Sequence, residues 1–291
     1  MRAMPTILFI IPYFGQWPFW MPFFIESCRA NRSINWLLVS DCAPLDALPP
    51  NVEQRYVGFK EYCAWISQRL GFTFAPVSAY KLCDLKPVYG YLHEADLKGY
   101  DFWGFSDIDL VYGDLRNYFT GPQLSKYKFF STHDRRVSGH LCLMRNLPEF
   151  RVLFRRIRNF KERLQDQQNH ALDEGAFSRL FLWRKNFPEP FFSLLGRVNP
   201  LRRVAEFKEA FSTPNAGRPW VDGSMNFPTR WYWDHGRLGN DLDGGREFPY
   251  LHFLGWKKTA WQSLDFEDSS ALTTLAQKRR WSIDAGGFHV L

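Results

Sequence analysis

Apolar residues in the first 115 positions gather in short runs that alternate with longer amphipathic stretches. The predicted strands are Thr6–Ile11, Asn35–Ser40 and Tyr100–Ser106, and the predicted helices are Phe19–Asn31, Phe59–Leu70 and Lys86–Leu97. Short, almost wholly apolar runs are typical of parallel strands that are buried on both faces. The alternation of strand and helix therefore predicts an α/β fold with a doubly wound, mostly parallel central sheet flanked by helices.

The pattern is weaker in the second part of the chain. Further strands are predicted at Tyr127–Ser131, His140–Met144 and Phe248–Leu254, and helices at Glu149–Leu164 and Ala171–Trp183. One face of the segment Glu149–Leu164 is apolar and the other carries arginines, as in an amphipathic helix. Residues 187–222 are rich in Pro, Phe and Arg without clear periodicity, so no element is predicted there.

Aromatic residues change the picture because they make up 18% of the 291 residues, more than a core of this size needs. Aromatic rings can pack on the apolar faces of sugars or lie at membrane interfaces. A bulky core is the simpler explanation for most of them. The same two alternatives hold for Trp231, Tyr232 and Trp233, which could form a sugar-binding platform or part of the core.

The net charge of +7 favours anionic partners such as nucleotide diphosphates or anionic lipid headgroups. No zinc-finger spacing, RNP-like strand or long basic run is present, so nucleic acid is not an expected partner. The five cysteines are scattered without a Cys-x-x-Cys pair, which favours reduced thiols. The N-terminus does not match a signal peptide and no apolar run is long enough to span a bilayer. We therefore expect a cytoplasmic protein that meets a membrane, if at all, at its inner surface.

Candidate chemistry begins where the strand Tyr100–Ser106 runs directly into Asp107 and Asp109. Residues i and i+2 of an extended segment point the same way, so the two carboxylates should converge at the end of the strand. Converging carboxylates repel each other, and a hard divalent cation with oxygen ligands removes that repulsion. The alternative is a solvated acidic turn.

A second candidate segment, His252–Lys258, lies far along the chain. Its imidazole could add a ligand for manganese, Gly255 would let the backbone approach a phosphate, and Lys258 would supply a positive charge. A half-buried histidine beside exposed lysines is the simpler alternative.

Two further segments could bind an anionic ligand. In Tyr80–Pro87, Asp84 could cap a helix whose N-terminus, with Lys81 and Lys86, favours anions, although the lysines could equally be solvated. Open α/β sheets bind ligands at the carboxyl ends of their strands. Pro12, Tyr13 and Phe14 follow the first predicted strand and Asp41 follows the second, so they are candidate contacts for a nucleotide, with Tyr13 and Asp41 assigned to its base and ribose.

These segments resemble a known family. His252–Lys258 is similar to the His-x-x-Gly-x-x-Lys signature of metal-dependent GT-A glycosyltransferases. Lys81–Pro87 and Phe102–Leu115 resemble the Lys-x-x-Asp-x-(Lys/Arg)-Pro and Asp-x-Asp blocks of bacterial capsule and lipopolysaccharide glycosyltransferase-like proteins. The resemblance implies a Rossmann-like GT-A fold with Mn²⁺ or Mg²⁺ held by Asp107, Asp109 and His252. It also implies diphosphate contacts from Gly255 and Lys258.

The resemblance also implies a domain organisation. A single catalytic domain would cover residues 1–265, with a nucleotide-binding half at 1–115 and a helical or irregular acceptor half at 116–265. Residues 266–291 would form a C-terminal extension.

Inverting GT-A enzymes have an Asp or Glu on the acceptor side that deprotonates the attacking hydroxyl. The resemblance implies that Asp173 or Glu174 takes this position. Two acidic residues at a helix N-terminus are an equally good explanation, with Asp173 the better candidate for the base. Inversion and retention both stay open. His133, Ser138 and His140 are candidate acceptor contacts, with Gly139 allowing close approach, although the histidines could equally be structural.

The function that these observations favour is metal-dependent transfer of a sugar from a nucleotide diphosphate donor, with a UDP-sugar the default. The acceptor would be a glycan or lipid-linked glycan in bacterial surface polysaccharide synthesis. The arginine-rich face at 151–163 makes an anionic membrane surface a further candidate partner. The alternative is a non-catalytic nucleotide-sugar or glycan-binding protein on the same fold. A metal-dependent phosphotransferase or hydrolase is disfavoured, because no glycine-rich phosphate loop is present.

Overall fold

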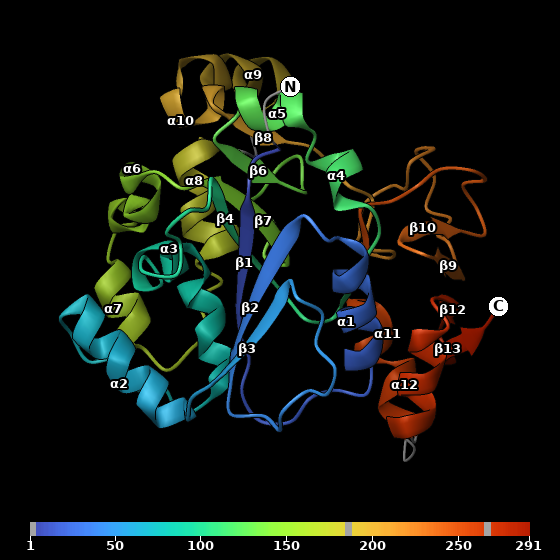
Figure 1. Ribbon diagram of the computed structural model, residues 1–291. Coiled ribbons are helices and arrows are strands. Elements are labelled where there is room, and N and C mark those ends of the chain that lie inside the picture. The colour runs from blue at the N-terminus through green and yellow to red at the C-terminus, as the bar shows by residue number, and fades with distance from the viewer. Residues whose placement is uncertain (1–3, 184–187, 265–268) are drawn as a thin grey trace.

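The computed structural model describes residues 4–183, 188–264 and 269–291, and its centre is a seven-stranded sheet (Figure 1). In spatial order this sheet contains β3 (Val52–Tyr56), β2 (Ile34–Ser40), β1 (Ile7–Pro12), β4 (Phe102–Ser106), β7 (Leu141–Arg145), β6 (Phe129–Ser131) and β8 (Ala205–Phe207). The pairs β3–β2, β2–β1, β1–β4 and β6–β8 are parallel, and β7 is antiparallel to both of its neighbours. The predicted mostly parallel α/β sheet is confirmed.

Two smaller sheets lie beside the central one. The four-stranded sheet contains β10 (Arg237–Asn240), β9 (Trp231–Asp234), β12 (Arg280–Asp284) and β13 (Gly287–Val290), and the two-stranded sheet contains β11 (Tyr250–His252) and β5 (Leu110–Tyr112). All pairs in these two sheets are antiparallel. Among these strands only β11 overlaps a predicted one, because the others are short or begin in loops with weak apolar patterning.

Helices cover both faces of the central sheet (Figure 1). The α-helices are α1 (Met21–Ala30), α2 (Phe59–Leu70), α3 (Tyr89–Leu92), α4 (Leu115–Tyr118), α5 (Gly121–Lys126), α6 (Pro148–Arg151), α7 (Phe160–Gln165), α8 (Ser178–Phe181), α9 (Glu189–Val198), α10 (Pro200–Arg203), α11 (Leu254–Lys258) and α12 (Ser269–Gln277). Four other helical segments are η1 (Ala79–Val88), η2 (Leu153–Arg156), η3 (Asp173–Phe177) and η4 (Ala260–Ser263). None of the helices in the described ranges has the length and apolar character needed to cross a bilayer.

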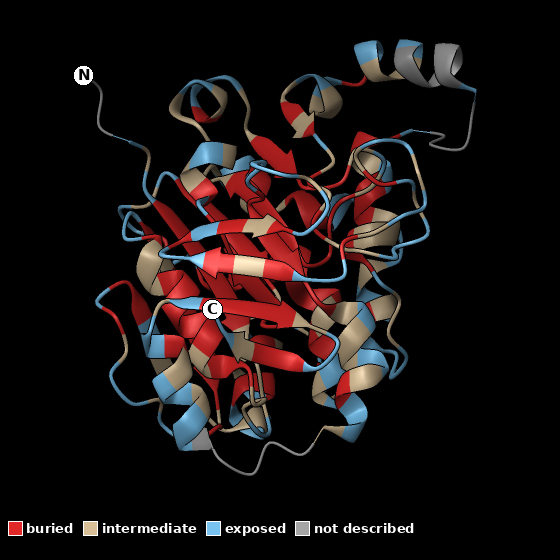
Figure 2. Ribbon diagram, turned by 90° about the vertical axis from the view of Figure 1, so that its right-hand side faces the viewer, coloured by how far each residue is buried: buried red, intermediate tan, exposed pale blue. Residues whose placement is uncertain are grey.

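The inner strands β1, β4 and β7 and the neighbouring β2 are buried on both faces, which explains why their sequences are almost wholly apolar. In β1, Leu8 and Ile10 point into one core cluster, whereas Ile7, Phe9 and Ile11 point into the other. Successive side chains of a strand point to opposite faces of the sheet, so helices packed on each face bury alternate residues of β1 in two separate cores. Figure 2 shows the result, with buried strands inside and exposed residues on helices and loops.

Two predicted helices are wrong in extent. The amphipathic pattern of Glu149–Leu164 is divided among α6, η2 and α7, because the backbone of Ile157 is extended and Asn159 has a left-handed φ of 55°. Its apolar residues Phe150, Phe154 and Leu164 are nevertheless buried, so the periodicity identified the core face correctly. In place of the predicted helix at Lys86–Leu97, the chain forms the 3₁₀ helix η1 and then the short α-helix α3. Lys86 and its neighbours are buried in the last turn of η1, which fixes the backbone there.

The C-terminal strands β12 and β13 pack on β9 and α1. β12 pairs with β9, and the rings of Trp233 and Trp281 stack with centroids 4.6 Å apart. The ring of Phe288 in β13 stacks on Phe23 of α1 at 3.7 Å. Trp231 is also fully buried, so the aromatic residues of β9 that could have formed an acceptor platform belong largely to this core.

Gly90 in α3 provides a test of how tightly the central core is packed. A Cβ at this position would lie 2.3 Å from the ring of the fully buried Trp103, so Gly90→Ala must displace an indole that has no free space. We expect a loss of about 1–3 kcal/mol in the free energy of unfolding, measured by chemical denaturation. Gly245→Ala is the matched control, because no atom lies within 4 Å of its added Cβ. Equal stability of the two variants would contradict this packing.

Candidate functional site

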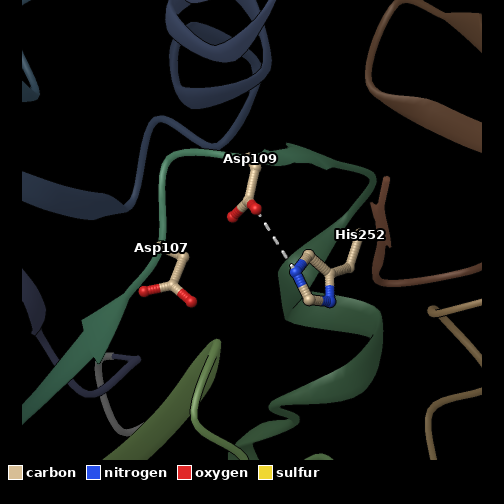
Figure 3. Close-up of side chains that lie close together, drawn as sticks. All are labelled: Asp107, Asp109 and His252. Atoms are coloured by element: carbon tan, nitrogen blue, oxygen red, sulfur yellow. Dashed lines mark ion pairs between the residues drawn. The ribbon is translucent and has the colours of Figure 1, made fainter. Parts of the chain in front are cut away.

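Asp107 and Asp109 lie in the turn that joins β4 to β5. The backbone N–H of Asp107 donates to the carbonyl of His140 (3.0 Å), and the Trp20 indole N–H donates to the carbonyl of Ile108 (2.9 Å). These two bonds hold the turn from opposite sides. Both carboxylates face one shared space (Figure 3), although the turn rather than strand alternation brings them together.

His252 reaches the same space through the pairing of β11 with β5, which places it opposite Leu110. The hydroxyl of Thr213 lies 3.1 Å from Nδ1 of His252, and Nε2 lies 3.6 Å from Oδ2 of Asp109. The ring also stacks on His140 with a centroid separation of 4.2 Å. His252 is therefore oriented on three sides, with Nε2 directed at the Asp109 carboxylate.

The three side chains fit a divalent cation. One ligand atom from each of Asp107, Asp109 and His252 lies within 4.8 Å of the others. Two carboxylate oxygens and one imidazole nitrogen suit Mn²⁺, and the oxygens suit Mg²⁺. The contact of Thr213 with Nδ1 is the kind of outer hydrogen bond that orients a metal-binding imidazole.

Two lysines neutralise the carboxylates. The buried ammonium of Lys86 lies 2.6 Å from Oδ1 of Asp107 and donates to the carbonyl of Gly139 (2.7 Å). The ammonium of Lys257, from α11, contacts Oδ2 of Asp109. Burial by itself would raise the pKa of Asp109, but His252 and the Lys257 ammonium hold that pKa well below its usual range.

A cleft of about 530 Å³ opens beside these residues. It is lined by Ile11, Pro12, Tyr13, Phe14, Trp20, Ala79, Tyr80, Leu82, Cys83, Lys86, Tyr89, Ser106, Asp107, Ile108, Asp109, Gly139, His140, Asn169, Ala171, Asp173, Glu174, His252, Leu254, Lys257 and Lys258. The cleft lies at the carboxyl ends of β1 and β4, the edge at which open α/β sheets bind ligands. Burial raises the pKa of the Cys83 thiol to about 11, so this cysteine is not a thiolate nucleophile at neutral pH.

Asp173 lies in the wall of the cleft at the first residue of η3. Its side chain is buried, and its Oδ2 is 4.0 Å from the ammonium of Lys86. Burial raises the pKa of Asp173 to about 6, although the Lys86 charge opposes this rise. A Cβ on Gly139 would lie about 3 Å from the carboxylates of Asp173 and Glu174, so a glycine is needed for their close approach. A carboxyl group that titrates near neutral pH is suited to proton transfer.

A comparison with protein families gives a match over residues 9–274 to a family of unknown function, DUF6625. The chain belongs to this family. The matched residues include every acidic, histidine and lysine side chain that lines the cleft of this DUF6625 member. No curated protein matches the chain.

Several solved structures are similar to this DUF6625 member at low identity. One is the galactosyltransferase LgtC in complex with donor and acceptor sugar analogs, with 12% identity, a TM-score of 0.38, and coverage of 94% of this chain and 96% of that chain. Another is mouse xyloside xylosyltransferase 1 (10% identity, TM-score 0.34, 72% and 87% coverage). A third is GlyE of Streptococcus pneumoniae (11%, 0.29, 70% and 45%). At these TM-scores the similarities carry no weight in the interpretation of the site.

Many of the residues selected from the sequence line the cleft together. They are Pro12, Tyr13, Phe14, Lys86, Asp107, Asp109, Gly139, His140, Asp173, Glu174, His252 and Lys258. Tyr13 stacks on Trp17 with a centroid separation of 5.4 Å, which fixes an aromatic face at the end of β1. Residues from six separate segments of the DUF6625 sequence thus meet in one place.

Lys81 and Asp84, which are predicted donor contacts, are buried and do not line the cleft. Their side chains form a buried ion pair (2.9 Å), and Lys81 also donates to the carbonyl of Arg163 (2.7 Å). Asp84 accepts from the backbone N–H of Leu172 (3.0 Å). This pair holds the segment that leads into Asp173 and therefore positions that carboxylate.

Four other predicted contacts lie outside the cleft lining. Asp41 accepts a hydrogen bond from the backbone N–H of Gly15 (2.8 Å), and Gly255 lies on α11 between lining residues. Ser138 is fully buried, and His133 is 3.0 Å from Glu209 in a neighbouring cavity. His133 still contacts His140, with ring centroids 5.1 Å apart.

Lys257 is the important site residue that sequence reasoning missed. The resemblance drew attention to Lys258, yet Lys257 contacts Asp109. Leu254, Lys257 and Lys258 share one face of α11, as residues i, i+3 and i+4 of a helix do, and all three line the cleft. Predicting a helix for this segment would have placed Lys257 on the same face as Leu254 and Lys258. Trp20 and the exposed Tyr80 also line the cleft, with no chemical signal in the sequence.

The pKa of Asp173 predicts how stability responds to pH. A rise of the pKa from 3.8 to about 6 corresponds to roughly 3 kcal/mol at most. The stabilising contribution of the protonated carboxyl is complete below pH 3.8 and is lost as the pH rises through 6. We therefore expect Asp173→Asn to be more stable than wild type at pH 7.5, with the difference disappearing near pH 4.

Denaturation of both proteins across this pH range measures the difference. Glu174→Gln is the control, because its carboxylate is one-third exposed and should show little of this effect. A destabilised Asp173→Asn at pH 7.5 would contradict the assigned burial cost.

Proposed function

We propose that this protein is a metal-dependent glycosyltransferase that moves a sugar from a nucleotide diphosphate donor to a hydroxyl acceptor. The observation that carries the proposal is the meeting of Asp107, Asp109 and His252 within 4.8 Å at the edge of the cleft. In the same cleft lie cationic side chains for a diphosphate and a buried carboxylate for proton transfer. A hydrolase would need the carboxylate and water, but not this array of cations.

The donor side is supported by the residues around the two aspartates. A divalent cation held by Asp107, Asp109 and His252 would supply Lewis-acid stabilisation of charge on the diphosphate. Lys258 would add a positive charge for the leaving group. The aromatic face of Tyr13, with Pro12 and Phe14, would pack against the nucleoside.

The acceptor side is supported by Asp173. With a pKa of about 6, its carboxylate is mostly ionised at neutral pH and can accept a proton from an attacking hydroxyl. Lys86, 4.0 Å away, would stabilise the ionised form before the proton is taken. Direct attack assisted by such a base favours inversion of configuration at the anomeric carbon.

The finer assignment rests on the motif resemblance. We propose a UDP-sugar donor, Mn²⁺ or Mg²⁺ as the ion, and a glycan or lipid-linked glycan of a bacterial surface polysaccharide as the acceptor. The proposed location is the cytoplasm, with contact to the anionic inner face of the membrane. The net charge of +7 agrees with anionic partners in general.

A second candidate function is binding of a nucleotide sugar or glycan without turnover. The observation that favours it is the pairing of Asp107 with Lys86 and of Asp109 with Lys257. Both carboxylates already have counter-ions, so a protein of this kind could bind an anionic donor through lysines without needing a divalent cation.

Nucleotide release separates the two candidates. Purified protein is incubated with Mn²⁺ and a panel of nucleotide sugars and glycan acceptors, and released nucleotide is measured. We expect release that requires the metal and that falls at least about 100-fold in Asp109→Asn, because the variant loses a charged ligand at the reacting centre.

Asp46→Asn is the matched control, since Asp46 is exposed and lies outside the cleft. Its activity should equal that of wild type. Tight binding of a nucleotide sugar with no release, in wild type and both variants, would overturn the transferase and favour the binding protein.

A further inference from the structure

We propose that Lys257 is an exchangeable counter-ion of Asp109, which holds the carboxylate until a divalent cation takes its place. The inference rests on the proposed function, because it concerns the cation site of that same cleft. It assigns to Lys257 a role distinct from that of the neighbouring Lys258.

The first argument is that Lys257 and a divalent cation need the same atom. The ammonium of Lys257 contacts Oδ2 of Asp109, and this is the oxygen that lies 3.6 Å from Nε2 of His252. Oδ2 is the Asp109 oxygen nearest to Nε2 of His252, so an ion held jointly by these two residues would be expected to bind at that oxygen. Two cations cannot share it at close range, since their mutual repulsion would cancel the attraction of one carboxylate.

The second argument is that Asp109 cannot be left without a cation. Its side chain is only 6% exposed, and a buried carboxylate without a partner is strongly destabilising. Asp107 also has an ammonium partner in Lys86. The cleft therefore keeps its carboxylates neutralised, whether or not a metal ion is present.

The third argument is that Lys257 can leave, whereas Lys86 cannot. The Lys86 side chain is 9% exposed and bonds to Asp107 and the carbonyl of Gly139, with Asp173 at 4.0 Å. The Lys257 side chain is 36% exposed and comes from the short helix α11 at the rim of the cleft. Its flexible stem can swing into the cleft beside Lys258, where a diphosphate would meet two ammonium groups.

Metal affinity tests the exchange directly. Binding of Mn²⁺ alone is measured by electron paramagnetic resonance of the free ion for wild type, Lys257→Met and Lys257→Arg. Removal of the competing charge should lower the Kd of Lys257→Met for Mn²⁺ roughly tenfold. Lys257→Arg keeps a cation on the side chain and should bind as weakly as wild type.

Two matched controls remove a lysine charge elsewhere. Lys258→Met removes a charge one residue away, and within the described ranges the structure pairs Lys257, not Lys258, with Asp109. Lys60→Met removes an exposed charge on α2 that does not line the cleft. Both should change the Kd less than threefold. A Kd for Lys257→Met that is unchanged or higher would overturn the proposal, as would an equal gain in Lys258→Met.

A second measurement follows the side chain itself. Reductive methylation of lysines in wild type, read by mass spectrometry, should modify Lys257 several times faster when Mg²⁺ is added, while Lys60 stays constant. Unchanged methylation of Lys257 at saturating Mg²⁺ would overturn the exchange.

These results are separable from the proposed function. Tighter Mn²⁺ binding by Lys257→Met in a protein without transferase activity would support the exchange and reject the transferase. Metal-dependent transfer with an unchanged Kd would do the reverse. Absence of Mn²⁺ binding in every variant would reject both.

Discussion

The pairing of β11 with β5 is the interaction on which the site depends. It is a short antiparallel ladder, yet it joins Leu110 to His252, which are far apart in the sequence. The backbone N–H of Phe253 extends the ladder by donating to the carbonyl of Asp109 (3.3 Å). Since the side-chain period of a strand is two, a slip of one residue would turn His252 away from the cleft. The burial of Leu251 on one face and Tyr250 on the other resists such a slip.

Electrostatic balance is the second constraint on the cleft. Asp107, Asp109 and Asp173 bring three carboxylates into one small volume, and Lys86 and Lys257 oppose them. Buried charges of this kind stabilise a fold poorly, because desolvation offsets much of their attraction. The concentration of these charged side chains beside a cleft is therefore better explained by a role in binding or catalysis than by a contribution to the stability of the fold. Burial raises the pKa of Asp173, whereas His252 and the Lys257 ammonium lower the pKa of Asp109 against the effect of its own burial.

The rest of the molecule holds these groups in place. Trp20 donates to the carbonyl of Ile108 and packs on Phe253 and Trp261, so the aromatic C-terminal core directly supports the turn that carries Asp107 and Asp109. On the opposite wall, the buried pair Lys81–Asp84 fixes the segment that precedes Asp173. Much of the high aromatic content is thereby explained by packing around the site rather than by sugar contacts within it.

The sequence by itself determined the elements whose signals are local. The apolar runs of β1, β2 and β4, the helix α2 with the same ends as predicted, and the parallel order of the first half all follow from periodicity. Motif chemistry selected Asp107, Asp109, His252 and Asp173, which meet in one cleft. Only the tertiary structure decided which lysines line the cleft. Lys81 and Lys257 look alike in the sequence. In the structure, however, Lys81 donates to the backbone carbonyl of Arg163, whereas Lys257 contacts the carboxylate of Asp109. The two lysines differ because of long-range packing. Their burial and their ion-pair partners depend on residues that folding brings together from distant parts of the chain, so the local sequence pattern cannot predict them.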